Sequence, residues 1–274
     1  MRFIPKLVTS RITASIKELS IGSIIDLCNT PTEYNELGIS KTIAAIVEET
    51  NLPLEQWTAQ ERYAAMLHYY YCVYFDSRHT AVLDEETGAV IDDYFLENKD
   101  YPVPKSNKFA QPHQEPLLKY DIVLDKDSEQ PDFLWMLPLT GEWIEAVERV
   151  VLGGYIKQIS DNVEIWRLVT ASAQILPRGI THEEAIKLAG VSIDKFICDN
   201  ANLILAMKSS DYEELMRAFD KGTEALDHIV TLRLSTSGFC LEGRKGGGDA
   251  LPSLRFLFNA LLGIRALGFR QRSA

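Results

Sequence analysis

The sequence lacks the residue patterns of the common metal and catalytic sites. Its four cysteines, Cys28, Cys72, Cys198 and Cys240, are far apart and fit no zinc or CxxC spacing, so we expect buried free thiols. None of the five histidines belongs to an HExxH motif, and no GxSxG nucleophile motif occurs. We therefore expect no metal, no cofactor and no enzymatic activity.

The sequence also lacks a long apolar run and an excess of positive charge. No segment approaches the roughly 20 apolar residues of a membrane-spanning helix, and the first residues have no apolar run of secretory length. The formal net charge is −11 and the pI is near 5.0, which disfavours binding to nucleic acid or to an anionic membrane. These features predict a soluble protein, made in a cytoplasm, with neither kind of partner.

Two patterns in the sequence have residue types that are also found in catalytic or phosphate-binding sites. Adjacent carboxylates at residues 48–49, 92–93 and 183–184 have the residue type of a general acid and base, but such pairs in an acidic chain are ordinarily solvated. The glycine-rich stretch around Arg244 and Lys245 has the residues of a phosphate cradle but lacks the lysine-serine/threonine ending of a P-loop. We interpret it as a hairpin tip, which would touch an acidic protein surface.

A helix is predicted over residues 57–75. Thr58 and Glu61 have the spacing of a capping box, so the helix should begin there. Beyond His68 it has no clearly polar side, which is typical of a central helix packed on several sides.

The same helix carries a concentration of tyrosines whose hydroxyls a dry core would have to satisfy. Two interpretations stay open: a core helix with tyrosine tips reaching solvent, or a helix that meets a neighbouring protein. The interface candidates are Trp57, Tyr69, Tyr70, Tyr71 and the Arg244-Lys245 tip.

The amino-terminal residues predict a strand followed by helices. Ile12, Ala14 and Ile16 alternate with polar residues over residues 10–19, as in a strand with one buried face. Ser20 is a candidate N-cap for a short helix that ends before Pro31. Residues 30–38 look turn-rich, and a further helix is predicted over residues 40–50.

The middle of the chain predicts a small sheet between helical blocks. Residues 81–95 resemble a hairpin, and residues 99–116 a proline-rich extended connector. Further strands are expected at residues 118–124 and 133–138.

A helical bundle is predicted to follow. Its helices are marked by candidate caps or breakers: Thr140 and Gly153-Gly154, Asp161 or Asn162 and Pro177, Thr181 with Glu184, Ser192, and Ser210 with Glu213.

The carboxy-terminal part returns to strand character. Residues 228–235 alternate and residues 238–256 pass through the glycine-rich turn, which predicts a hairpin. Residues 256–269 fit either a helix or a strand in a partner's sheet. The predicted fold class is thus α+β and mostly α-helical, with small antiparallel sheets or hairpins, and the predicted division is 1–78, 79–138, 139–227 and 228–274.

Four aromatic residues in the middle of the sequence could serve either in binding or in core packing. Trp135, Trp143, Tyr155 and Trp166 are large flat side chains of the kind that binds a carbohydrate or a protein partner. Their helix and strand positions equally suit core packing.

Two stretches resemble the tail proteins of tailed bacteriophages, of the baseplate hub and tail-assembly type. The first is the strand, short helix and WTAQER helix start of residues 4–76, and the second is VTLRLSTSGFCLEGRKGGGDALPSLRF. The matching residues are Pro5, Ser10, Leu19, Ser20, Trp57, Thr58, Glu61 and Arg62. Cys240 stands alone where relatives carry paired cysteines, and residues 80–175 lie outside the resemblance.

The resemblance implies a structural or assembly role without a catalytic site. It predicts a virion component in or near the baseplate, present in several copies and bound to other tail proteins. A tail assembly chaperone absent from the mature virion, or a tail-associated glycosidase using two acidic residues, are the alternatives.

Overall fold

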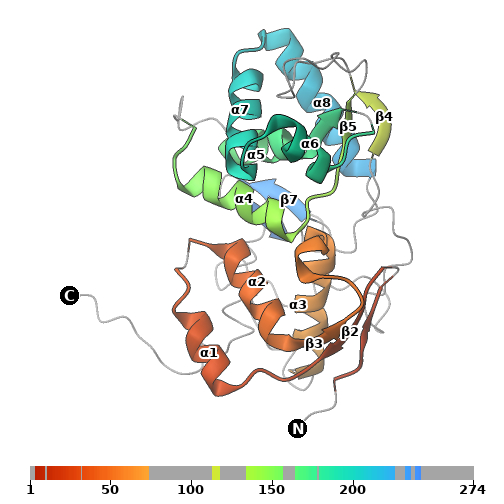
Figure 1. Ribbon diagram of the computed structural model, residues 1–274, viewed down its shortest axis with the longest axis vertical. Coiled ribbons are helices and arrows are strands. Elements are labelled where there is room, and N and C mark those ends of the chain that lie inside the picture. Colours follow the sequence, from red (N-terminus) through yellow and green to blue (C-terminus); the bar gives the residue numbers. More distant parts are fainter. Residues whose placement is uncertain are drawn as a thin grey trace, which may run out of the picture. The chain divides into compact units, whose positions relative to one another are not determined.

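The structure, a computed structural model, describes residues 4–9, 11–31, 33–73, 113–117, 134–156, 164–177, 179–225, 232–235 and 238–241. These residues contain eight α-helices and three small antiparallel sheets, so the chain is a mostly helical α+β protein, as predicted (Figure 1). They divide into two compact units. The first unit holds residues 4–54, 60–73 and 232–241; the second holds residues 55–59, 113–117 and 134–225.

The first unit is built around three helices. Their bounds are α1 at Ile21–Cys28, α2 at Asn35–Ile46 and α3 at Ala59–Val73, with a short 3-10 turn at Leu54–Gln56 before α3. Ser20 caps α1, because its side chain accepts a hydrogen bond from the Ser23 amide. Helix α3 begins directly after Thr58, where the sequence places it.

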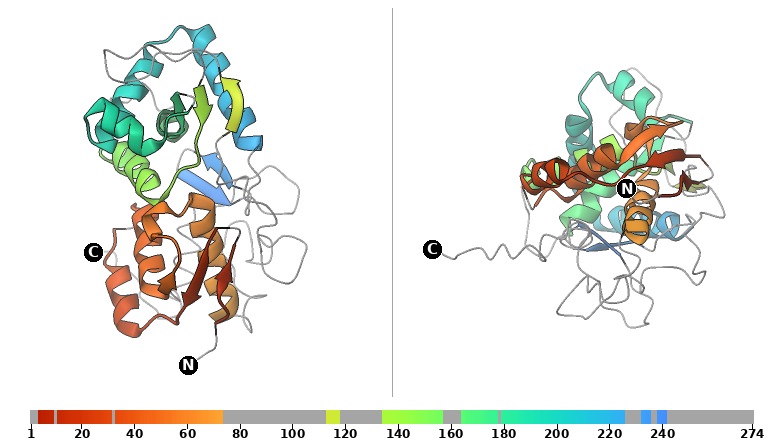
Figure 2. Two further views of the ribbon diagram at one scale, coloured as in Figure 1. Left: turned by 45° about the vertical axis from the view of Figure 1, so that its right-hand side comes forward. Right: turned by 90° about the horizontal axis from the view of Figure 1, so that it is seen from below.

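A three-stranded sheet lies beside these helices (Figure 2). It has the order β1 (Leu7–Val8), β2 (Thr13–Ile16), β3 (Val47–Thr50), with antiparallel pairing throughout. The alternation predicted for β2 is confirmed, since Ile12, Ala14 and Ile16 are buried.

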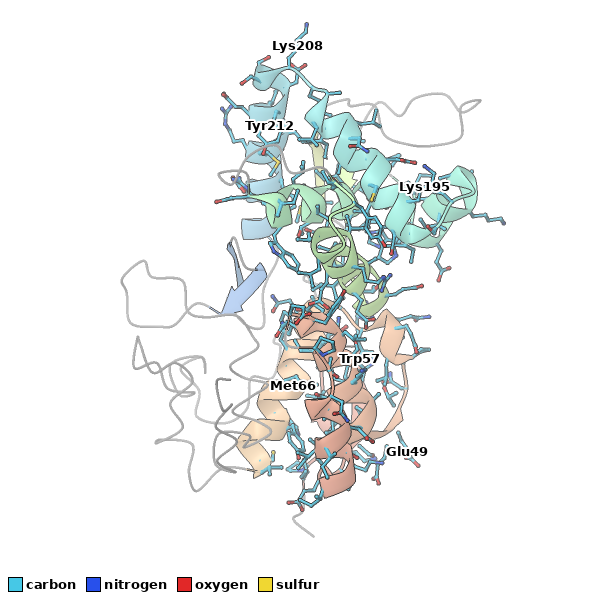
Figure 3. All side chains as sticks on the ribbon, turned by 90° about the vertical axis from the view of Figure 1, so that its left-hand side faces the viewer. Glu49, Trp57, Met66, Lys195, Lys208 and Tyr212 are labelled. Carbon is cyan, nitrogen blue, oxygen red and sulfur yellow. The ribbon has the colours of Figure 1, made fainter. Side chains whose placement is uncertain are left out.

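The helix predicted over residues 40–50 is wrong at both ends. Helix α2 starts earlier, at Asn35, in a stretch predicted to be turns, where Glu36 in the first turn suits the positive end of the helix dipole. Residues Val47–Thr50 form β3 instead of helix, because pairing with β2 supplies their backbone hydrogen bonds. Glu48 and Glu49 are exposed, as expected, and Figure 3 shows Glu49 on the outer side of this unit.

The second unit combines a small sheet with five helices. The sheet has the order β4 (His113–Leu117), β5 (Leu134–Met136), β6 (Ile175–Pro177). Strand β5 is confirmed. The end of the predicted connector, residues 113–116, is instead part of β4, and the predicted helix end at residues 175–177 is β6. In both places pairing with β5 overrides the local pattern.

The helices of the second unit begin close to their predicted caps. They are α4 (Gly141–Leu152), α5 (Ile165–Gln174), α6 (His182–Ala189), α7 (Ile193–Leu205) and α8 (Ser209–Ala225). Thr181 and Glu184 form both bonds of a capping box, and Ser192 caps α7. Ser210 is not a cap, because α8 already begins at Ser209 and the Ser210 hydroxyl bonds Asp211.

The predicted carboxy-terminal hairpin exists with a different turn. Strands β7 (Leu232–Ser235) and β8 (Gly238–Leu241) pair with residues 236–237 between them, so the glycine-rich stretch follows the hairpin instead of forming its tip. The hairpin predicted at residues 81–95, the strand at 118–124 and the segment 256–269 lie outside the described residues. The four-part division of the chain stays a prediction.

Candidate interaction surface

Helices α2 and α3 are joined by a buried cluster of polar side chains. The Arg62 guanidinium donates to the carbonyl oxygen of Glu36 at 2.8 Å and to Ser40 Oγ at 2.7 Å, and its Nη1 lies 3.6 Å from Glu36 Oε2. The Tyr63 hydroxyl donates to Glu36 Oε1 at 2.7 Å. Glu36 and Arg62 are only 2% and 1% exposed. Because each charge has partners inside the chain, this cluster joins two helices and presents no charge to a ligand.

Further polar groups of α3 hold the amino-terminal residues. Glu61 Oε1 lies 3.3 Å from Arg11 Nε, and His68 Nε2 donates to the Pro5 carbonyl oxygen at 2.9 Å. Burial lowers the pKa of His68, and the bond to Pro5 opposes that shift only in part. A neutral ring that donates from Nε2 therefore suits this position.

Two of the predicted interface residues are buried in the described structure. Trp57 is 0% exposed, and its carbonyl accepts a hydrogen bond from the Gly141 amide at 2.9 Å. Tyr69 is also buried, and its hydroxyl accepts the Leu19 amide at 3.1 Å. Both residues thus contribute to packing within the folded chain, the core alternative considered for this helix.

The other interface candidates lie outside the described part of the chain. The side chains of Tyr70 and Tyr71 are among them, as are Arg244 and Lys245. The interface role of all six candidates stays a prediction.

Trp143 belongs to an aromatic cluster inside the second unit. Its ring stacks on His182 with centroids 4.1 Å apart and meets Phe196 edge-on at 5.9 Å. His182 Nε2 also donates to the Ala173 carbonyl oxygen at 3.0 Å. Burial lowers the pKa of His182 to about 4, against a smaller opposing effect of this hydrogen bond. His182 is therefore neutral at pH 7 and joins α6 to α4.

The remaining central aromatics separate into core and surface residues. Trp166 is buried, and the indole of Trp135 donates to the Ile180 carbonyl oxygen at 3.1 Å. Tyr155 differs, because 63% of it is exposed.

Tyr155 follows the glycine pair that ends α4. A Cβ added to Gly153 would come within 2.6 Å of the Tyr155 ring, so the ring lies directly against this glycine. Gly154 has a φ of 63°, a conformation that favours glycine. Leu152 adds a second exposed apolar side chain beside the turn. An exposed aromatic ring that rests on the backbone loses little freedom on binding, as a contact residue should.

A second exposed apolar surface lies on α1 and was missed in the sequence. Ile21 and Ile25 are one helical turn apart and are 73% and 58% exposed. Among the described side chains of this helix, only Leu27 is buried. The low charge of this segment could have predicted the apolar surface, because IGSIIDLC contains a single charged residue, Asp26.

The described side chains offer little to a catalytic or metal site. Glu184 is engaged in the α6 capping box, whose backbone bond to Thr181 lowers its pKa. Cys72 and Cys198 are free thiols, and burial raises the pKa of Cys198. No group of three or more metal-binding side chains occurs among the residues that the structure describes. Within the same residues, no helix has the length and apolarity needed to cross a bilayer.

Comparisons with protein-family models, with curated proteins and with solved structures found no match for this chain.

Proposed function

We propose that this protein is a structural component of a bacteriophage tail, located in the baseplate or its hub and acting through protein–protein contacts. It would be present in several copies and bound to other tail proteins. The proposal begins from the sequence resemblance and is supported by the way the described side chains are used.

The observation that carries the proposal is the structural use of the resembling residues. Arg62 and Glu61 form ion pairs with Glu36 and Arg11, and Ser20 caps α1. Residues whose side chains bond to one another inside the chain stabilise its fold. Catalytic residues would instead present reactive groups in a cleft. This use of the pattern suits a protein that acts through its shape and surface.

The same pattern also joins segments far apart in the chain. Thr58 forms a β-bridge with Thr140, and the Ala59 amide donates to the Leu139 carbonyl oxygen at 2.9 Å. The start of α3 thus pairs with the residues before α4, which gives Trp57 and Thr58 a structural role.

The decisive experiment compares infected-cell lysate with purified particles of the phage that encodes this chain, using quantitative mass spectrometry. A structural component is expected in both, at more than one copy per particle. Presence in lysate but not in particles would identify an assembly chaperone and contradict the proposal.

Tyr155 provides a test at the level of one residue. Tyr155→Ala should lower incorporation into particles by roughly tenfold, because exposed aromatic anchors commonly contribute about 1–2 kcal/mol or more to an interface. The matched control is Lys208→Ala, at an exposed residue that points away from the helices of the second unit (Figure 3). Equal incorporation of the two variants would remove Tyr155 from the contact surface.

A further inference from the structure

The three-stranded sheet of the first unit has an unpaired strand at each edge. Its order is β1-β2-β3, and among the residues that the structure describes, β1 and β3 pair only with β2. A strand edge with free backbone groups is a site where a further strand can be added. The sheet can therefore be extended on both sides.

The bonds to β2 show which backbone groups of the edge strands point outward. The Thr9 amide donates to the carbonyl oxygen of the residue before β2 at 2.8 Å, so the N–H and C=O of Val8 point away from β2. The Asn51 amide donates to the Thr13 carbonyl oxygen at 3.3 Å, so the same groups of Thr50 also point away from β2. Each edge thus presents a donor and an acceptor to a further strand.

The two edges carry opposite charge. The β3 edge presents the exposed side chains of Glu48 and Glu49, whereas exposed Lys6 directly precedes β1. Charged residues commonly protect a sheet edge against pairing with another edge. Two β3 edges would bring four carboxylates together, and two β1 edges would bring two amines together. A β3 edge against a β1 edge instead brings carboxylates to an amine, so charge favours the mixed pair.

The strand directions determine the geometry of this mixed pair. Strands β1 and β3 are both antiparallel to β2, so they run parallel to each other. If a second copy keeps its helices on the same side of the sheet, its β1 pairs with β3 of the first copy in parallel. One continuous sheet then passes through both copies.

The charged side chains lie on one face of such a sheet. Glu49 is opposite Ser15, the neighbour of buried Ala14, so it lies on the face away from the core. Val8 is 52% exposed and lies on the same outer face. Lys6 is two residues before Val8 and shares its face, because side chains alternate along a strand. A parallel β3–β1 pair therefore places Glu49 and Lys6 of the neighbouring copy on the same side.

The size of the contact favours an assembly of several copies over a pair. A single strand edge is smaller than a stable pairwise interface, which buries at least about 1,200 Å². A head-to-tail contact leaves one edge of each terminal copy free, so copies add in series and form a ring or a filament. In a closed ring two contacts hold every copy, and the high effective concentration strengthens each of them.

We propose that copies of this chain join head to tail through their sheets, with β3 of one copy against β1 of the next. Backbone hydrogen bonds join the two strands, and Glu48 and Glu49 pair with Lys6 of the neighbouring copy. The inference rests on the several copies of the proposed function, but the purified chain tests it without other tail proteins. Its failure would therefore leave the outcome of the particle experiment open.

Zero-length cross-linking of the purified full-length chain tests the contact. Unlabelled and isotope-labelled protein are mixed and treated with a carbodiimide, which joins an amine to a neighbouring carboxylate. The expected product links Lys6 to Glu48 or Glu49 in peptides that combine both isotopes. Lys208, an exposed lysine of the second unit, is the control amine and should give no link to β3. Links between peptides of one isotope only, no Lys6 link, or equal linking of Lys208 would each overturn the inference.

Charge reversal provides a second measurement, by sedimentation velocity over a range of protein concentrations. Glu48→Lys with Glu49→Lys should weaken self-association about tenfold, because both edges are then basic. Lys6→Glu should also weaken it, because both edges are then acidic. A mixture of the two variants should associate again, since each edge meets an opposite charge. The matched control is Glu213→Lys with Glu214→Lys, at two adjacent exposed acids of α8, which should associate like the wild type.

Two results of the sedimentation experiment would contradict the inference. One is a wild-type chain that stays monomeric at every concentration. The other is a mixture of the two charge variants that associates no more than either variant alone.

Discussion

The Arg62–Glu36 pair shows how single residues stabilise the first unit. Both side chains are buried, and Arg62 also donates to the Glu36 carbonyl oxygen and to Ser40. Removing one member of a buried ion pair leaves the other charge with fewer partners in a medium that solvates it poorly.

Arg62→Met should therefore lower the free energy of unfolding of the first unit by about 3 kcal/mol. Urea denaturation measures this change. The control is Lys195→Ala, which removes an exposed pair with Asp199 and should cost less than about 0.5 kcal/mol. Equal losses from the two variants would contradict a special role for the buried pair.

His182 should make the second unit sensitive to acid. Its pKa is about 4 in the folded chain and 6.5 in the unfolded chain, so between these pH values the unfolded state binds more protons. His182 therefore contributes on the order of 3 kcal/mol to the free energy of unfolding above pH 6.5. This contribution is lost as the pH falls toward 4.

The comparison variant is His182→Phe, which keeps a ring against Trp143 but does not titrate. Between pH 7 and pH 4 the wild type should lose about 3 kcal/mol more unfolding free energy than this variant. Parallel pH profiles in urea denaturation would show that His182 does not control the acid response.

At the scale of elements, helix caps and strand pairing decide where helices end. Helix α6 depends on its cap, because Ala185 is its only fully buried residue and the helix has just eight residues. In such a short helix, hydrogen bonds at the first turn form a large part of the total.

Thr181→Ala should lower the free energy of unfolding of the second unit by about 1 kcal/mol. Thr181→Ser keeps the hydroxyl and should restore most of the loss. Ser210→Ala serves as the comparison at a residue inside α8, where no cap is removed, and should have little effect. Thermal unfolding followed by circular dichroism distinguishes the three variants, and equal shifts would contradict the capping role.

At the scale of the whole molecule, each unit has its own buried apolar residues. Ile12, Ile39 and Ile46 lie in the first unit, whereas Ile144 and Phe196 lie in the second. Units with separate cores commonly unfold in separate steps.

Calorimetry of the full chain should therefore show more than one transition. Arg62→Met should shift a different transition from Thr181→Ala, because the two residues lie in different units. A single transition displaced by both variants would show that the chain unfolds as one cooperative body.

Much of the helix pattern was predictable from neighbouring residues. The caps Ser20, Thr181 and Ser192 and the alternation of β2 are local signals, since each involves residues within a few positions of one another. Glu48 and Glu49 are exposed as predicted, but they lie in β3 and not in the predicted helix.

The sequence alone thus determined the fold class and most helix starts, because capping and periodicity act over short distances. Of the four cysteines predicted to be buried free thiols, Cys72 and Cys198 are described as free thiols, and both are only partly buried. Only the tertiary structure decided that Val47–Thr50 and Ile175–Pro177 are strands, because their hydrogen-bonding partners lie far away in the chain. It also decided that Glu36 meets Arg62 across 26 positions, and that Tyr155 and Ile21 are exposed while Trp57 is buried. Burial depends on which segments pack together, and that is a property of the whole chain.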